Sequence, residues 1–151
     1  KEGAKVFYDG WIAEEMVCYS ESVGGLITLE DLKRHTSDWI EPVCSRYRGH
    51  DIWELPPSGQ GIAALQILNI FDRHDIAAMG HNSADYIHLF TEAKKLAFAD
   101  RAKFYADPQV EKTLPIAELI SKPYAEWQTK RIDMAKAAQR VPAGVTYDGR
   151  T

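Results

Sequence analysis

The stretch SADYIHLFTEAKKLAFADRAKFYAD, from Ser83 to Asp107, decides the fold of this chain. One row of its apolar side chains recurs at steps of three, four or seven residues, the period of an α-helix with one apolar face. The row consists of Tyr86, Phe90, Ala93, Ala97 and Phe104. A second apolar row, made of Ile87, Leu89, Leu96 and Ala99, leaves little of the circumference polar. We therefore expect a long core helix that other elements cover on more than one side.

Both ends of this helix are marked in the sequence. Ser83 is the predicted N-cap, and Asp85 places a negative charge in the first turn, where the helix dipole favours it. Asp107-Pro108 predicts the end, because the proline ring disfavours the α conformation at the preceding residue. At the usual rise per residue, such a helix would be roughly 35 Å long, about the width of a small domain.

The composition is that of an ordinary globular chain, with 151 residues, 45% hydrophobic and 26% charged. One domain is the expectation for this length. A net charge of -4 argues against a nucleic-acid partner, which usually presents a basic stripe. No apolar run approaches the roughly 20 residues that a membrane span needs. The chain begins Lys1-Glu2-Gly3, without a start methionine or signal peptide, which predicts a processed or excised piece.

A β-hairpin is predicted from Val43 to Arg48 and Asp51 to Leu55, with Gly49-His50 as its two-residue loop. This register pairs Tyr47 with Ile52, Arg46 with Trp53, and Arg48 with Asp51. One side of the ribbon would then be apolar, while the other would carry a cation–π contact and an ion pair. A lone hairpin is barely stable in water, so it must join a larger sheet. Too few other strands are present in the sequence to make one.

Caps and apolar spacing predict further helices on both sides of the hairpin. The first is Trp11 to Ser20, which follows a predicted turn at Phe7 to Gly10 and ends before a break at Gly24-Gly25. The second is a short helix with a capping box at Thr28 to Asp31, inward-facing Leu29 and Leu32, and an end near Thr36. The others are Ile62 to Phe71, Pro115 to Ile120, and Pro123 to Ala138, the last capped by Ser121. Residues 72–82 are a predicted connector. The segment from Val141 to Thr151 has no periodicity and is expected to be irregular or disordered.

The turn Ser58-Gly59-Gln60-Gly61 is the first candidate for chemistry, because free amides before a helix can hold an anion. It lacks the lysine and spacing of a phosphate loop, and it is not G-x-G-x-x-G. The favoured reading is structural: Ser58 caps the helix and the glycines allow tight packing. Ser58 is also not a hydrolase nucleophile by motif, since no G-x-S-x-G surrounds it.

Cysteine and histidine patterns give no reaction centre. Cys44 and His50 could be a nucleophile and its base, but the predicted register puts them near opposite ends of the ribbon. Cys18 and Cys44 show no metal spacing; buried free thiols are favoured over a disulfide, and the redox compartment stays open. The five histidines contain neither H-E-x-x-H nor an i,i+4 pair, so zinc is not expected.

The charged pairs on the central helix are expected to have a structural role and no catalytic one. Glu92 with Lys95 and Asp100 with Lys103 stand three residues apart and are expected to form a solvated stripe. Arg101 falls on the same face as Ala97 and Phe104, so we expect a carboxylate to anchor it in a structural ion pair. From the residues alone, no catalytic, cofactor-binding or metal-binding residue is assigned.

Several stretches together resemble the gamma-glutamyltransferase family. They are Phe7-Tyr8-x-Gly10-x-Ile12-Ala13, Gly24-Gly25-Leu26-Ile27-Thr28-x-Glu30-Asp31-Leu32, Tyr47-Arg48-Gly49, Pro56-Pro57-Ser58-x-x-Gly61-Ile62-Ala63, Leu68-Asn69-Ile70, and Glu92-Ala93-x-Lys95-Leu96-Ala97-Phe98-Ala99-Asp100-Arg101. Their order resembles the C-terminal half of that family's large subunit. Residues 1–140 would then be a partial large-subunit domain, followed by the tail at 141–151.

The resemblance implies a helix-rich α+β fragment of an N-terminal nucleophile hydrolase, whose αββα sandwich would supply the missing strands. In that family a precursor cuts itself, and the new N-terminal threonine of the small subunit takes a γ-glutamyl group from glutathione or a related amide. The group then passes to water or an amino acid. The implied partners are the small subunit and the γ-glutamyl donor. No cofactor is implied, and the family is often periplasmic or secreted in bacteria, which leaves the compartment of this chain open.

Two departures from the family pattern limit what the resemblance implies. The loop Ser58-Gly59-Gln60-Gly61 lacks the serine pair of many glutathione-active members and is closer to the cephalosporin-acylase-like branch. Thr151 is not followed by the strand of the nucleophile motif, so it is not assigned that role, and no catalytic residue is carried over. The alternative from another class is a non-enzymatic helical scaffold that docks a partner through an exposed apolar face.

Overall fold

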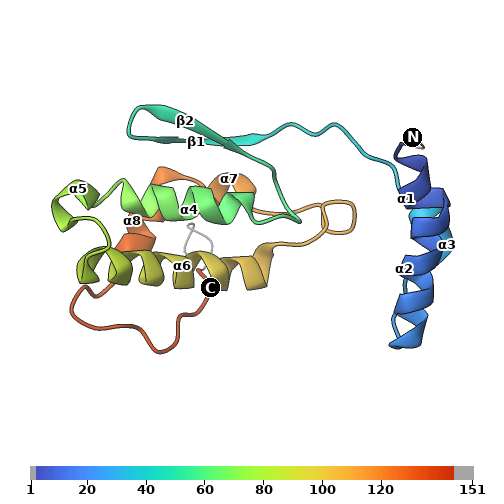
Figure 1. The fold of residues 1–151 in the computed structure, drawn as a ribbon. Helices are drawn as coiled ribbons and strands as arrows, with labels where there is room; N and C mark the ends of the chain where they lie inside the picture. Colours follow the sequence, from blue (N-terminus) through green and yellow to red (C-terminus); the bar gives the residue numbers. More distant parts are fainter. Residues whose placement is uncertain (1–2, 145–151) are drawn as a thin grey trace. The chain divides into compact units, whose positions relative to one another are not determined.

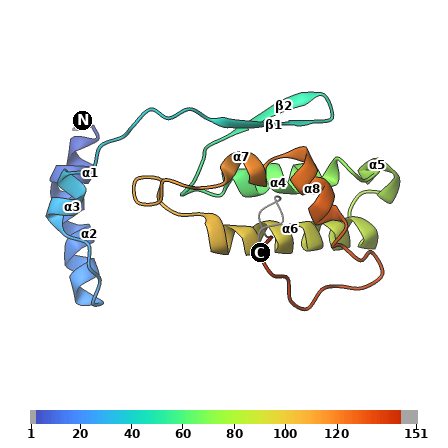
Figure 2. The ribbon, with the colours of Figure 1, turned by 180° about the vertical axis from the view of Figure 1, so that it is seen from behind.

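A computed structural model describes residues 3–144 of the protein (Figures 1 and 2). Its contacts divide the chain into two units, Lys1–Trp39 and Ile40–Thr151. The elements form a helix-rich α+β structure with one hairpin among the described residues, which confirms the predicted fold class. No helix within residues 3–144 combines the length and the apolar character required to cross a membrane.

The described residues of the first unit, 3–39, form three helices, α1 (Lys5–Asp9), α2 (Trp11–Ser22) and α3 (Leu29–Lys33). The predicted turn at Phe7 to Gly10 is wrong, because α1 occupies most of it and the extended backbone of Gly10 separates α1 from α2. The capping box of α3 is confirmed: the Asp31 amide donates to the Thr28 hydroxyl at 3.2 Å, and the Thr28 amide donates to the Asp31 carboxylate at 2.9 Å. Leu29 is 37% exposed, so it does not face inward as predicted.

The second unit begins with the hairpin of β1 (Val43–Tyr47) and β2 (His50–Glu54). Tyr47 pairs with His50 and Arg46 with Asp51, so the loop is Arg48-Gly49, one residue earlier than predicted, and each predicted cross-strand partner is wrong by two residues. The turn explains the difference. Both loop residues have positive φ angles, 48° at Arg48 and 87° at Gly49, as a type I′ turn requires.

Helix α4 (Gly61–Phe71) lies between the hairpin and the long helix α6 (Ala84–Phe104), as Figure 1 shows. It carries much of the core, with Ile62, Leu65 and Ile70 almost fully buried. Three shorter helices lie in the described part of this unit: α5 (Ile76–Met79) inside the predicted connector, α7 (Ile116–Leu119), and α8 (Lys122–Thr129). The predicted helix at Ile62 to Phe71 is thus confirmed, starting one residue earlier.

Helix α6 is the predicted long helix, with differences at one end. The Ser83 hydroxyl accepts from the Tyr86 amide at 3.1 Å, which confirms the N-cap. The helix ends at Phe104 rather than Asp107. The backbone becomes extended at Tyr105, whose hydroxyl donates to Gln66 of α4 at 2.8 Å.

The buried face of α6 mixes members of both predicted apolar rows. Its core residues are Leu89, Ala93, Leu96 and Ala97, whereas Phe90 is 41% and Ile87 51% exposed. Leu89, Ala93 and Leu96 pack with Ile70 and Phe71 of α4 in one core cluster. The expected coverage on more than one side is confirmed, because α4 lies against one side and the chain after α8 against another.

Helix α8 is shorter than predicted. Ser121 accepts from the Tyr124 amide at 3.2 Å, as the predicted cap requires, but the helix stops at Thr129 instead of Ala138. Residues 130–144, here named the return segment, run alongside α6 without regular secondary structure (Figures 1 and 2). Of the predicted tail, residues 145–151 lie outside the described part of the chain.

Candidate functional site

The turn before α4 holds no side-chain cap. The N-cap position is Gln60, and Ser58 is exposed and does not cap the helix, so that expectation is wrong. The expectation of tight packing is confirmed at Gly61, where an added Cβ would lie 2.6 Å from the Leu55 carbonyl oxygen and 2.8 Å from the Glu54 Cβ. Glycine is needed there for close approach of the hairpin's exit to α4.

Cys44 and His50 do not meet. Cys44 pairs across the ribbon with Trp53, and His50 pairs with Tyr47 at the loop end. The two residues thus lie near opposite ends of the ribbon, as predicted. Cys18 and Cys44 are free, but Cys18 is exposed and Cys44 half-buried, so the expectation of two buried thiols is wrong. Within residues 3–144, no group of three or more His, Cys, Asp or Glu side chains is arranged to hold a metal ion.

The polar centre of the second unit is Asp100 on α6, which is fully buried. Its Oδ2 accepts from Gln66 Nε2 of α4 at 2.8 Å and from two groups of α8, the Tyr124 hydroxyl at 2.8 Å and Gln128 Nε2 at 2.9 Å. Its Oδ1 accepts from the Gly144 amide at 2.7 Å. One carboxylate therefore joins α4, α6, α8 and the return segment.

The phenols around Asp100 are held in their neutral form. Burial, followed by the negative charge of Asp100, raises the pKa of Tyr124 far above its ordinary value of 10.0. The same two causes raise the pKa of Tyr105. Both hydroxyls therefore stay protonated and serve as donors, Tyr124 to Asp100 and Tyr105 to Gln66.

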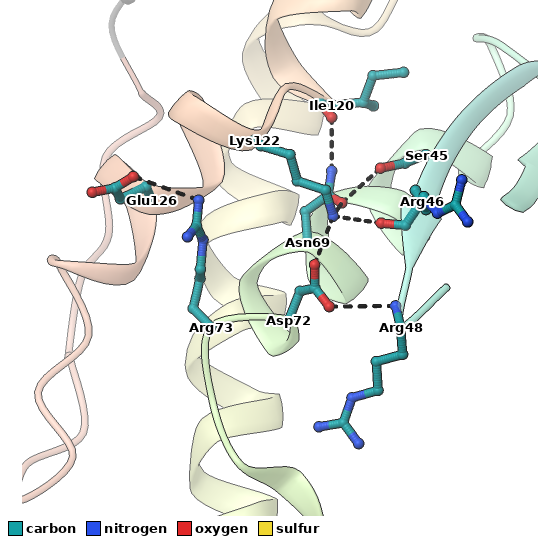
Figure 3. A network of polar contacts seen from close by, with 9 residues as sticks. All are labelled: Ser45, Arg46, Arg48, Asn69, Asp72, Arg73, Ile120, Lys122 and Glu126. Atoms are coloured by element: carbon teal, nitrogen blue, oxygen red, sulfur yellow. Dashed lines mark hydrogen bonds and ion pairs between the residues drawn. The ribbon is translucent and has the colours of Figure 1, made fainter. Parts of the chain in front are cut away.

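A second network joins the hairpin to α4 and α8 (Figure 3). Asn69, fully buried on α4, accepts from the Ser45 hydroxyl at 2.6 Å and donates to the Ile120 carbonyl at 2.7 Å. The Lys122 ammonium donates to Asn69 Oδ1 at 2.8 Å, to Asp72 Oδ2 at 3.0 Å, and to the Arg46 carbonyl. The hydrogen bond from Lys122, ahead of its positive charge, lowers the pKa of Asp72.

A third set of contacts lies where the sequence predicted a solvated stripe. Lys95 and Glu92 do form an ion pair, at 2.6 Å, but Glu92 is only 3% exposed and its Oε2 accepts from the Ala138 amide at 3.2 Å. Asp100 is buried as described, and Lys103 lies over the Phe104 ring instead of beside Asp100. The stripe prediction is therefore wrong for both carboxylates.

A signal for these buried carboxylates was present in the sequence. Glu92 lies three residues after Leu89 and four before Leu96, and Asp100 lies one helical turn after Leu96 and Ala97, so both fall within the apolar circumference. A charge inside such a surface must find buried partners. Arg101 has its guanidinium 5.6 Å from the centre of the Phe98 ring. The ion pairs formed within residues 3–144 do not include Arg101, so the expected carboxylate anchor is not there.

The chemistry open to these groups follows from their partners. A carboxylate offers about four acceptor positions, and Asp100 uses four hydrogen bonds from Gln66, Tyr124, Gln128 and Gly144. It has little capacity left to take a proton from a substrate. The networks therefore hold elements in place, and no nucleophile–base pair is assembled within the described residues.

Comparisons with known proteins bear on the whole chain. A sequence model of the family described as gamma-glutamyltranspeptidase matches residues 1–150. The chain is 41% identical over 137 residues to an Acylase ACY 1 proenzyme of Pseudomonas sp. (strain V22), covering 90% of this chain and 24% of that protein. It is 34% identical over 145 residues to the glutathione hydrolase-like YwrD proenzyme of Bacillus subtilis, covering 95% of this chain and 27% of that protein.

Comparison of the fold with solved structures finds the same family. The structure resembles the crystal structure of Helicobacter pylori gamma-glutamyltranspeptidase with a TM-score of 0.74 and 35% identity, over 93% of this chain and 41% of that one. The chain thus spans about a quarter of the length of the curated relatives that it matches.

Proposed function

The chain belongs to the gamma-glutamyltranspeptidase family, and on that premise we propose that it is the part of a self-cleaving acyltransferase or hydrolase that supports the reaction without performing it. The complete enzyme would transfer a γ-glutamyl group from glutathione or a related amide to water or an amino acid. The nucleophile would be the N-terminal threonine of a small subunit from the same precursor. The chain alone would be inactive.

One observation carries this proposal. The buried polar groups of the second unit are committed to one another: Asp100 accepts four hydrogen bonds, and Asn69 both accepts and donates. Such networks rigidify a scaffold, and among residues 3–144 the side chains that form them are not free to attack a carbonyl. The relatives named proenzymes support a precursor that matures by cleavage.

The test compares the chain with the full-length precursor. Both are purified and assayed with a chromogenic γ-glutamyl anilide, with a threonine-to-alanine variant at the precursor's cleavage junction as control. We expect turnover by the matured precursor only. Turnover by the 151-residue chain would overturn the assignment of the nucleophile to the small subunit.

Of the two donor classes, glutathione and a related amide, we further propose the related amide. The loop Ser58-Gly59-Gln60-Gly61 departs from the glutathione-active pattern, and an acylase proenzyme is among the similar relatives. A matched pair of anilides, one γ-glutamyl and one lacking the α-amino group, separates the two donor classes. Faster hydrolysis of the anilide without the amino group supports the acylase assignment, and strict dependence on the amino group contradicts it.

The exposed apolar side chains support a prediction about the isolated chain. On the hairpin side Trp53 is 61% and Leu55 59% exposed, and on α6 Ile87 is 51% exposed. We predict that the chain alone self-associates or binds a hydrophobic dye. A monomer without dye binding would contradict this prediction and favour the alternative of an independent, non-enzymatic scaffold module.

A further inference from the structure

The return segment is fastened to α6 by four polar side chains, His88, Glu92, Lys95 and Asp100, here named the polar row. The first three share one face of the helix, and Asp100 lies on the neighbouring face, which also contacts α4. His88 Nε2 lies 2.9 Å from the Asp133 carbonyl oxygen, and Lys95 Nζ donates to the Ala138 carbonyl at 2.7 Å. Glu92 accepts from the Ala138 amide, and Asp100 accepts from the Gly144 amide. Every partner on the return segment is a main-chain atom.

The contacts advance in step along both partners. From His88 to Asp100 the helix rises about 18 Å, while the bonded positions on the return segment move from Asp133 to Ala138 and then to Gly144. The segment therefore runs in the same direction as α6. A chain without regular hydrogen bonding is in this way held at three places by one rigid element.

The last contact is the most confined. Asp100 and the Gly144 backbone are both buried, and their hydrogen bond is 2.7 Å long. A Cβ added at Gly144 would lie 1.8 Å from the Tyr124 hydroxyl oxygen and 2.8 Å from its Cζ. Space and hydrogen bonding thus fix the chain at the same point. A side chain at position 144 could not be accommodated without moving Tyr124, which also donates to Asp100.

We propose that the polar row is a positioning device that sets where and in which direction the chain beyond Gly144 leaves the fold, and that self-cleavage of the precursor depends on it. This inference rests on the proposed function. In such a cleavage the threonine hydroxyl oxygen attacks the preceding carbonyl carbon, the C–N bond breaks, and the amine takes the hydroxyl proton. Water then hydrolyses the ester to a carboxylic acid and the free threonine hydroxyl. An attack of this kind depends steeply on orientation, and a rigid upstream anchor supplies it.

The four residues act through the main chain, so they are positioning residues. The test uses the full-length precursor with the paired substitution Glu92→Gln and Lys95→Met, which weakens the middle contact and leaves the buried Asp100 network intact. The matched control is Arg73→Met with Glu126→Gln, which removes an exposed pair 3.5 Å apart between the end of α4 and α8. Both pairs of substitutions remove one positive and one negative charge.

Three quantities are measured for each protein: the thermal midpoint, amide hydrogen exchange at Ala138 and Gly144, and the self-cleavage rate well below the thermal midpoints. In the Glu92/Lys95 variant we expect exchange at Ala138 to rise about tenfold or more, since hydrogen bonds to charged groups are lost. We expect self-cleavage to slow by about tenfold or more. The control should keep wild-type values of both.

The outcomes separate the two proposals. A wild-type precursor that never cleaves itself would overturn the proposed function and this inference with it. If the wild type cleaves and the variant, with Ala138 demonstrably released, cleaves equally fast, the inference alone is overturned. Unchanged protection at Ala138 in the variant would likewise overturn it, because the row would then not hold the segment. Slowing in the control as large as in the variant would show a general stability effect and also contradict it.

Discussion

The two units of this chain are built to different standards of packing. Among the described residues of the first unit, only Ala13, Val17 and Ser20 are buried, while Trp11 is 62% and Leu26 91% exposed. The second unit has two core clusters and fully buried polar residues such as Asn69 and Asp100. The difference teaches that the second unit has the contacts of a stable core, whereas the first is held by local caps and by exposed contacts between its helices, such as the Lys33–Asp9 ion pair.

The sharpest way to test this contrast is Asp100→Ala. The change strands the donors of Gln66, Tyr124 and Gln128 in a buried site, and it frees the Gly144 amide. We expect the free energy of unfolding of the second unit to fall by about 3–5 kcal/mol. Urea unfolding followed by tryptophan fluorescence measures it, with Trp11 and Trp39 replaced by Phe so that the signal comes from the second unit. Asp51→Ala, which removes a surface ion pair of 3.9 Å, is the control and should change stability by less than about 1 kcal/mol.

A smaller loss is expected from Lys122→Met, at the junction of the hairpin, α4 and α8. The ammonium has three acceptors and is partly exposed, so we expect about 1–2 kcal/mol of destabilisation at neutral pH. Loss of the hairpin's protection in hydrogen exchange would locate the effect. A variant as stable as the wild type would show that Lys122 does not join these elements.

The same substitution predicts a pH dependence. Lys122 lowers the pKa of Asp72 below its ordinary value of 3.8, so the carboxylate's contribution to stability is present above about pH 4. It is lost as the pH falls through the lowered folded-state pKa. The stability difference between wild type and Lys122→Met should therefore shrink in acid. Unfolding midpoints at neutral pH and at about pH 3 test this expectation, and a difference that grows in acid would contradict the assigned cause.

The smallest effect is expected in the first unit, from Thr28→Ala. The substitution removes the hydroxyl that accepts from the Asp31 amide, and such caps are worth about 1 kcal/mol. Because α3 has no fully buried residue to compensate, we expect its helical chemical shifts to fade while the second unit is unchanged. A shift of the whole unfolding curve would instead show that the two units unfold together.

Sequence reasoning worked where a structure depends on neighbouring residues. The caps at Ser83, Thr28 and Ser121 were predictable because each hydroxyl oxygen accepts a hydrogen bond from the backbone amide only three residues later. The hairpin was predicted, but its register was missed. The tight turn needed a positive φ at two successive residues, and placing glycine second, as in Arg48-Gly49, would have given the observed pairing.

Prediction from the sequence failed where the local structure depends on contacts with segments far away in the chain. The length of α8 depends on α6, since residues beyond Thr129 bond to His88, Glu92 and Lys95 instead of continuing a helix. The roles of Asp100 and Glu92 depend on partners in α8 and the return segment. Spacing on α6 alone cannot show such partners, although the apolar surroundings already implied that they exist.

The main-chain character of the polar row also determines which positions can vary. Since α6 grips carbonyl and amide groups, the side chains of Lys136, Gln139 and Arg140 contribute nothing to that grip. Substitutions at these three exposed positions should therefore leave the path of the segment unchanged, whereas Arg131, Ile132 and Val141 hold it through their own side chains. Gly144 cannot be substituted in this way, because a side chain there would collide with Tyr124. The four side chains of the polar row on α6 cannot be substituted either without loss of their hydrogen bonds.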